Sequence, residues 1–70
     1  MDFEITDTYI ELYKLLKATG LCETGGMAKN AISEGLVRVN GQTDFRKRCK
    51  LRPGEKVEFQ DQTVMVTRKT

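Results

Sequence analysis

The sequence contains no histidine and only two cysteines among its 70 residues. Histidine is the side chain most often used as a general acid or base, and its absence also removes the usual mixed histidine–cysteine spacing of a zinc site. Two cysteines, Cys22 and Cys49, cannot form a framework of several disulfide bridges. We expect both to be reduced thiols that bind no metal, and a single bridge between them stays open as the alternative.

Several motifs of catalysis are also missing. The chain has no nucleophile elbow, no phosphate loop ending in Lys-Ser or Lys-Thr, and no pair of carboxylates in a pocket-like pattern. Cys49 lies among cations, which would lower the pKa of its thiol, but no base accompanies it as catalytic thiols usually require. We therefore expect a protein that is not an enzyme and that uses no cofactor.

No apolar run approaches the roughly 20 residues that a membrane-spanning helix needs. The first four residues, Met-Asp-Phe-Glu, are acidic and lack the basic start and apolar stretch of a signal peptide. The pattern predicts a cytoplasmic protein without a membrane partner.

The charge is distributed unevenly along a chain whose formal net charge is only +2. Residues 1–13 contain four acids and no base, whereas residues 46–52, which we name the basic run, contain five cations and no acid. The cations of the basic run are Arg46, Lys47, Arg48, Lys50 and Arg52. Five like charges within seven residues form a local field that attracts polyanions.

Hydrophobic periodicity predicts a single domain over residues 1–70, in the order strand, two helices, four strands. We expect strands at residues 2–6, 36–39, 42–45, 56–59 and 63–67, and helices at about 9–19 and between Thr24 and Gly35. In the first helix, Thr8 and Glu11 fit a capping box, and Tyr9, Leu12, Tyr13 and Leu16 form an apolar stripe. The class is α+β, with two short helices packed on a small, mostly antiparallel sheet, and residues 68–70 are expected to fray.

Local signals mark the ends of these elements. Thr24 is a suitable N-cap for the second helix, and Gly35 is placed to close it in a left-handed conformation. Leu36 follows where a Schellman motif makes an apolar contact back onto the helix. Asn40-Gly41 predicts a tight hairpin turn, and Pro53-Gly54 predicts a type II turn.

The segment from Ala28 to Gly41 reads A-x-x-x-I-x-x-G-x-V-x-V-N-G. This pattern resembles the core of the RNA-binding domain named after small-subunit ribosomal protein S-four. The resemblance continues back through Leu12, Leu16 and Gly20 and forward to the PGEKV segment at residues 53–57, so that residues 8–58 match the family core. The string RKRCK at residues 46–50 is similar to small stand-alone bacterial proteins of the YbcJ-like type.

The resemblance implies the S-four-type fold, also called the alpha-L motif, and binding of structured RNA such as ribosomal or transfer RNA. It also implies association with ribosomes or other ribonucleoproteins, and we expect a monomer. Together with the charge pattern it predicts an RNA-binding surface of Lys29, Arg38, Asn40, Gly41, Gln42, Arg46, Lys47, Arg48 and Lys50. A phosphate is a further possibility at the free N–H groups of the second helix, at Thr24, Gly25 and Gly26; a loose helix start is the equal alternative.

Many family members carry an arginine early in the first helix and a Ser-Arg pair at the start of the second. Glu11 and Thr24-Gly25 stand at those positions here, so the prediction rests mainly on the basic run. Phe45 is the one aromatic residue expected to be exposed, since Phe3, Phe59, Tyr9 and Tyr13 fall on predicted core faces. Two other functions stay open, a protein-interaction adaptor and, less favoured, a helix-turn-helix DNA binder.

Overall fold

The chain folds into two short helices and a mostly antiparallel sheet, which confirms the α+β prediction. The structure is a computed structural model, and it describes residues 1–69. Its elements are β1 (Asp2–Ile5), β2 (Ile10–Glu11), α1 (Leu12–Ala18), α2 (Gly25–Ser33), β3 (Arg38–Val39), β4 (Gln42–Thr43), β5 (Lys50–Leu51), β6 (Lys56–Phe59) and β7 (Gln62–Arg68).

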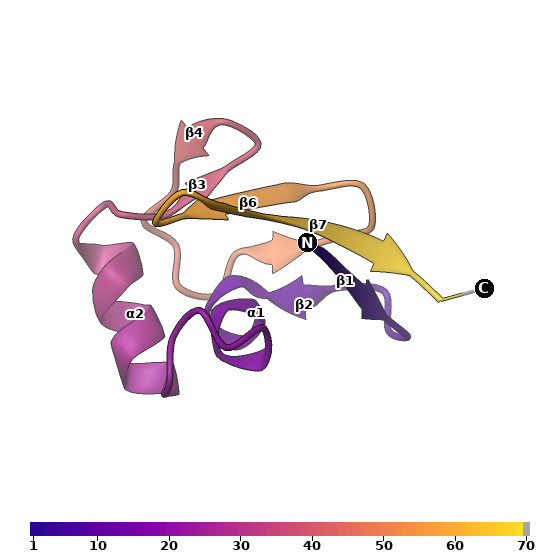
Figure 1. Cartoon of the computed structure of the whole chain (residues 1–70), viewed down its shortest axis with the longest axis horizontal. Helices are drawn as coiled ribbons and strands as arrows, with labels where there is room; N and C mark the ends of the chain where they lie inside the picture. The colour runs from indigo at the N-terminus through magenta and orange to yellow at the C-terminus, as the bar shows by residue number, and fades with distance from the viewer. Residues whose placement is uncertain (70) are drawn as a thin grey trace.

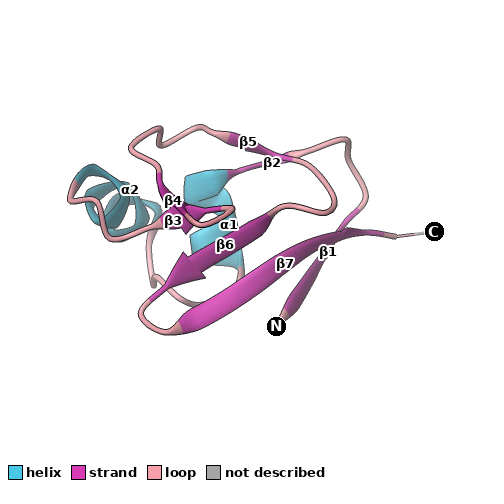
Figure 2. Ribbon diagram, turned by 90° about the horizontal axis from the view of Figure 1, so that it is seen from above, coloured by secondary structure: helices cyan, strands magenta, loops and turns pink. Residues whose placement is uncertain are grey.

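The main sheet has the strand order β1-β7-β6-β3-β4. Neighbouring strands in this sheet are antiparallel, with one exception: β1 and β7, the first and last strands of the chain, pair in parallel. Both helices lie on the same side of this sheet, below it in Figure 1. A second sheet consists of β2 and β5 alone, seen side by side in Figure 2.

The space between the helices and the sheet is filled by aliphatic side chains, with one aromatic residue and two cysteines. Side chains that alternate along β6 and β7 face this core, as their period of two predicts. The buried residues are Ile5, Leu12, Leu15, Leu16, Cys22, Ala28, Ala31, Ile32, Val37, Val39, Cys49, Leu51, Val57, Phe59, Val64 and Val66. In the part of the chain that the structure describes, no polar or charged residue is buried with them.

Helix α2 begins and ends as its sequence predicts. The Thr24 hydroxyl accepts a hydrogen bond from the Met27 N–H at 3.1 Å. At the other end Gly35 has φ +76°, its N–H donates to the Ile32 carbonyl, and the Leu36 N–H donates to the Ala31 carbonyl, both at 3.1 Å. These two bonds form a Schellman motif. The Leu36 side chain nevertheless remains 54% exposed, so it does not become part of the core.

Helix α1 begins three residues later than predicted, and the expected capping box is wrong. The N-cap is Glu11, which makes no side-chain capping bond. The residues before the helix instead pair with a distant segment, Ile10 opposite Leu51 and Glu11 opposite Lys50. This extended conformation at β2 excludes a helix start at Thr8 and leaves Tyr9 38% exposed rather than in the core.

The turns follow the sequence closely. Asn40 and Gly41 both have positive φ, at 53° and 85°, as a type I′ hairpin turn requires. Gly54 has φ +98°, and the Glu55 N–H donates to the Arg52 carbonyl at 3.1 Å, as expected for a type II turn.

The predicted frayed end is wrong for residues 68 and 69. Strand β7 continues through Arg68, and the Lys69 N–H donates to the Ile5 carbonyl at 3.0 Å. The parallel pairing with β1 supplies partners that a free tail would lack. Thr70 lies outside the described residues. None of the described helices is long and apolar enough to cross a bilayer.

Gly35 should be the glycine least tolerant of a side chain. Gly35→Ala places a Cβ at positive φ and 3.2 Å from Cε1 of Phe45, so we expect a loss of at least about 1 kcal/mol in the free energy of unfolding. Gly26→Ala is the matched control, because its Cβ meets only Thr24 Oγ1 at 3.9 Å in a helix that favours alanine. Urea unfolding of the two variants checks this, and equal stability of both would contradict it.

Candidate nucleic-acid interface

The basic run is held against the start of helix α1 by its backbone. The Leu12 N–H donates to the Cys49 carbonyl at 2.9 Å, and the Tyr13 N–H donates to the Lys47 carbonyl at 3.1 Å. These donors belong to the first turn of the helix, where N–H groups have no partner within the helix. The bonds therefore stabilise the helix start and place the run beside helix α1.

Side chains within the basic run alternate between the core and the solvent. Cys49 and Leu51 are buried, whereas Arg48, Lys50 and Arg52 are exposed. The alternation follows from strand β5, which the sequence did not predict and which pairs with β2. The two buried side chains anchor the run and leave its cations facing outward.

Two lysines from different helices meet at the ring of Tyr13. Lys29 of α2 has its Nζ 4.7 Å from the ring centroid, and Lys14 of α1 has its Nζ 5.9 Å away. Tyr13 is half-buried, and its ring lies against Gly25, where a Cβ would be 3.8 Å from the ring. Cation–π attraction thus holds both ammonium groups near the junction of the helices.

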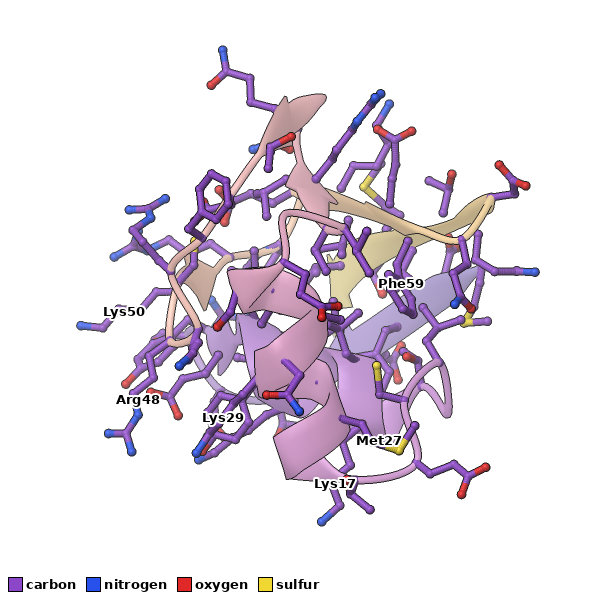
Figure 3. The ribbon with its side chains drawn as sticks, turned by 90° about the vertical axis from the view of Figure 1, so that its left-hand side faces the viewer. Lys17, Met27, Lys29, Arg48, Lys50 and Phe59 are labelled. Carbon is purple, nitrogen blue, oxygen red and sulfur yellow. The ribbon has the colours of Figure 1, made fainter. Side chains whose placement is uncertain are left out.

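The exposed ring of Tyr9 contacts a lysine of the basic run in the same way. Lys50 has its Nζ 5.1 Å from the Tyr9 centroid. Figure 3 shows Lys29, Arg48 and Lys50 near one another on the side of the molecule where helix α2 faces the viewer. We define the basic surface as the cations that these contacts and Figure 3 bring together: Lys14, Lys29, Arg48 and Lys50. Lys47 is exposed next to Arg48 in the basic run.

Lys14 was not predicted as a site residue. It also pairs with Glu11 at 3.2 Å, and the i, i+3 spacing of the two residues could have shown this pair from the sequence. Its position beside Lys29 depends on how the helices pack, which the sequence pattern does not reveal. Within residues 1–69, none of Lys29, Lys47 and Arg48 is paired with a carboxylate.

Arg46 differs from the other cations because its guanidinium is already occupied. Its Nη2 lies 2.7 Å from Asp44 Oδ2, and its Nε lies 3.1 Å from Asp44 Oδ1. The Arg46 backbone N–H also donates to Asp44 Oδ1 at 2.8 Å. These hydrogen bonds from Arg46 lower the pKa of Asp44 to about 2 and raise the pKa of Arg46 above its ordinary value.

The prediction that neighbouring cations lower the pKa of Cys49 is wrong. Burial raises the pKa of this thiol, and the negative charge of Asp44 raises it further, which together outweigh the opposing effect of Arg46. Burial also raises the pKa of the Cys22 thiol. Both cysteines are free and buried. Among the described residues, no group of three His, Cys, Asp or Glu side chains could hold a metal ion.

Other predicted site residues lie on strands β3 and β4 and on the turn between them, not on the segments that carry the basic surface. Successive side chains of a strand point to opposite faces, so Arg38 lies on the sheet face opposite the one on which its neighbour Val39 is buried. Arg38 pairs with Glu58 of β6. The Asn40 amide is used within the fold: its Oδ1 accepts from the Lys56 N–H at 2.9 Å, and its Nδ2 donates to Glu55 at 3.4 Å. Gly41 is in the turn, and Gln42 is exposed on the edge strand β4.

The start of helix α2 is held by contacts within the protein. The Thr24 hydroxyl caps the helix, Gly25 packs on Tyr13, and Gly26 is open to solvent. The phosphate site at these residues stays a prediction. Phe45 is 63% exposed, as predicted, but it is not the one exposed aromatic residue, because Tyr9 is exposed as well.

Residues 3–67 of the chain match the model of one protein family, the S4 domain. The chain belongs to the S4 domain family. Over 58 residues it is 47% identical to YbcJ of Escherichia coli (strain K12) and to YbcJ of Shigella flexneri, with 83% of each chain covered.

The solution structure of YbcJ from E. coli is similar over 94% of this chain and 85% of that one, with a TM-score of 0.73 and 42% identity. It is described as revealing an alpha-L motif involved in RNA binding. The 30S ribosomal protein S4e from Thermoplasma acidophilum shares the fold, with a TM-score of 0.69 at 20% identity over 83% of this chain and 31% of that one. These similarities confirm the predicted fold. This fold disfavours the alternative that the protein is a helix-turn-helix DNA binder.

The thiols should react slowly while the protein is folded. Cys22 and Cys49 are 4% and 7% exposed, and burial raises the pKa of both, so little reactive thiolate is accessible. We expect an unreduced protein to take up two alkyl groups in denaturant and to react much more slowly without it. Mass spectrometry checks this; a mass two hydrogens lower, with no alkylation in denaturant, would show a disulfide instead.

Arg46 should control the titration of Asp44. Because the pKa of Asp44 is lowered, the ionised pair stabilises the fold fully above about pH 4 and loses this effect as the pH falls through about 2. Arg46→Gln should return the pKa of Asp44 toward its ordinary value, as measured by NMR titration of the carboxyl carbon. Arg48→Gln is the matched control, because within residues 1–69 Arg48 makes no hydrogen bond or ion pair with Asp44. An equal effect of both variants would contradict the assignment.

Proposed function

We propose that the protein binds structured RNA, of the ribosomal or transfer RNA class, without catalysing a reaction on it. The observation that carries this proposal is the convergence of cations from α1, α2 and the basic run on one side of the molecule. Membership of the S4 domain family and the likeness to YbcJ, whose alpha-L motif is described as involved in RNA binding, support it.

The mode of binding would be phosphate and shape recognition. Lysine and arginine side chains that neutralise phosphates release bound counterions, so affinity falls as salt rises. The cations of the basic surface are exposed or half-buried and come from three segments, α1, α2 and the basic run. Such a surface suits the regularly spaced phosphates of a folded RNA better than a single small anion.

The aromatic contacts add to the proposal because they hold the cations in place before RNA arrives. A free lysine side chain loses considerable rotamer entropy when it is ordered. Lys29 and Lys50 lie over Tyr13 and Tyr9, so part of this loss occurs on folding. Asp44 also holds Arg46 in place, but unlike the tyrosine rings it partly neutralises the charge of the cation. We therefore assign Arg46 to the support of the basic run more than to RNA.

The triple variant Lys29→Gln, Arg48→Gln, Lys50→Gln tests the proposal. We expect it to bind transfer RNA or ribosomal RNA fragments much more weakly, with a salt dependence shallower by roughly 0.7–0.9 for each lost phosphate contact. Binding is measured by salt titration of fluorescence anisotropy, with circular dichroism as the check on folding.

The matched control is Arg38→Gln, Arg68→Gln, Lys69→Gln, which removes the same charge from exposed positions elsewhere. If both triple variants bind alike, net charge alone controls affinity and the basic surface is not the site. If the wild-type protein binds no RNA, the proposed function is wrong and the adaptor alternative replaces it.

We also propose that the protein acts as a monomer in the cytoplasm, on ribosomes or other ribonucleoprotein particles. Its support is the family likeness rather than a contact within the structure. Sedimentation of a cell extract, with and without ribonuclease treatment, separates particle-bound from free protein and checks this part independently.

A further inference from the structure

Phe45 is the most exposed large hydrophobic side chain among residues 1–69, at 63%. The core does not need it, because it lies outside the cluster of buried residues. An exposed phenylalanine lacks the favourable free energy that burial of its ring would give. Its surroundings indicate what it could contact instead.

The ring has a defined position at the end of helix α2. A Cβ built on Gly35 would lie 3.2 Å from Cε1 and 3.4 Å from Cζ of Phe45, so the far edge of the ring rests on the Gly35 backbone. The methyl group of Thr43 lies beside the same glycine, at 3.6 Å from that Cβ position. One edge of the ring is therefore supported, and most of its surface is open to solvent.

The backbone on both sides of Phe45 is also fixed. The Asp44 N–H donates to the Val37 carbonyl at 3.1 Å, and the Arg46 N–H donates to Asp44 Oδ1 at 2.8 Å. The residue is thus carried on a hydrogen-bonded turn. A ring held in this way loses little further entropy when a ligand covers it.

The charges next to the ring select the ligand. Phe45 lies between Asp44 and Arg46, which pair with each other, and Lys47 and Arg48 follow without a carboxylate partner among residues 1–69. A molecule that covers the ring therefore lies close to positive charge that is not neutralised. A nucleotide combines a planar aromatic face with a phosphate, which matches an aromatic ring followed by cations. An apolar protein side chain would cover the ring but leave the cations without counter-charge.

We propose that Phe45 stacks on an unpaired base of bound RNA, so that the protein prefers an RNA helix adjoining a loop or bulge over a continuous duplex. This inference rests on the proposed function and adds a substrate class to it. Bases within a duplex are stacked on each other and cannot offer a free face, whereas loops and bulges can. The phosphates of the adjoining helix would lie on the basic surface.

The test compares an RNA hairpin that has a single-stranded loop with a blunt duplex of the same stem. Phe45→Ala should weaken hairpin binding about 5- to 150-fold, the range found for loss of one base–aromatic stack, and should leave duplex binding and the salt slope unchanged. Phe45→Tyr should retain the affinity, because tyrosine stacks as well. Met27→Ala is the matched control: Met27 is 51% exposed and lies across helix α2 from Arg48 in Figure 3.

A direct signal is available because the chain has no tryptophan. A single tryptophan in Phe45→Trp should be quenched by the hairpin and much less by the duplex, whereas a tryptophan in Met27→Trp should respond to neither. Thermal unfolding of each variant shows whether it folds, and the tryptophan variant tests the proposal even if the alanine variant does not fold.

The outcomes separate this inference from the proposed function. If Phe45→Ala binds the hairpin as well as wild type while the Lys29, Arg48 and Lys50 variant does not, stacking is wrong and RNA binding stands. If Phe45→Ala weakens hairpin and duplex equally, the ring supports the basic run rather than a base. If the wild-type protein binds neither RNA, both proposals fail.

Discussion

Two backbone hydrogen bonds, from the N–H groups of Leu12 and Tyr13 to the carbonyls of Cys49 and Lys47, join the first helix to the basic run. They satisfy donors that an isolated helix would leave to solvent, and they hold a strongly charged segment against the core. The β2–β5 pair and the buried Leu51 continue the same attachment. Without it the cations would have no fixed position relative to the helices.

The positive charge of the molecule is arranged by aromatic rings and by one carboxylate. Tyr13 holds lysines from both helices, and Tyr9 holds Lys50, so ammonium groups from distant segments are ordered on one side. Asp44 removes Arg46 from this group by pairing with it. Glu11 likewise reduces the charge that Lys14 presents to a ligand, whereas Lys29 and Arg48 have no carboxylate partner among the described residues and present their full charge.

Elements with both ends marked in the sequence were predicted well. Helix α2 lies between the Thr24 cap and Gly35, as expected, because hydroxyl capping and the left-handed glycine act within a few residues. Helix α1 was mispredicted at its start. There the capping signal of Thr8 competed with pairing between residues 10–11 and 50–51, and nothing near residue 8 reveals a partner forty positions away.

The sequence by itself determined the α+β class, the turns, the buried valines and the run of five cations, because each depends on neighbouring residues and on periodicity. Only the tertiary structure decided which cations share a surface. Strand pairing places Arg38 on the far face of the sheet beside Glu58, and the Asn40 amide is taken up by the backbone of β6. Lys14 and Lys29 meet at Tyr13 because the helices pack together. A surface assembled from segments distant in the chain depends on contacts between them, and no local pattern encodes those contacts.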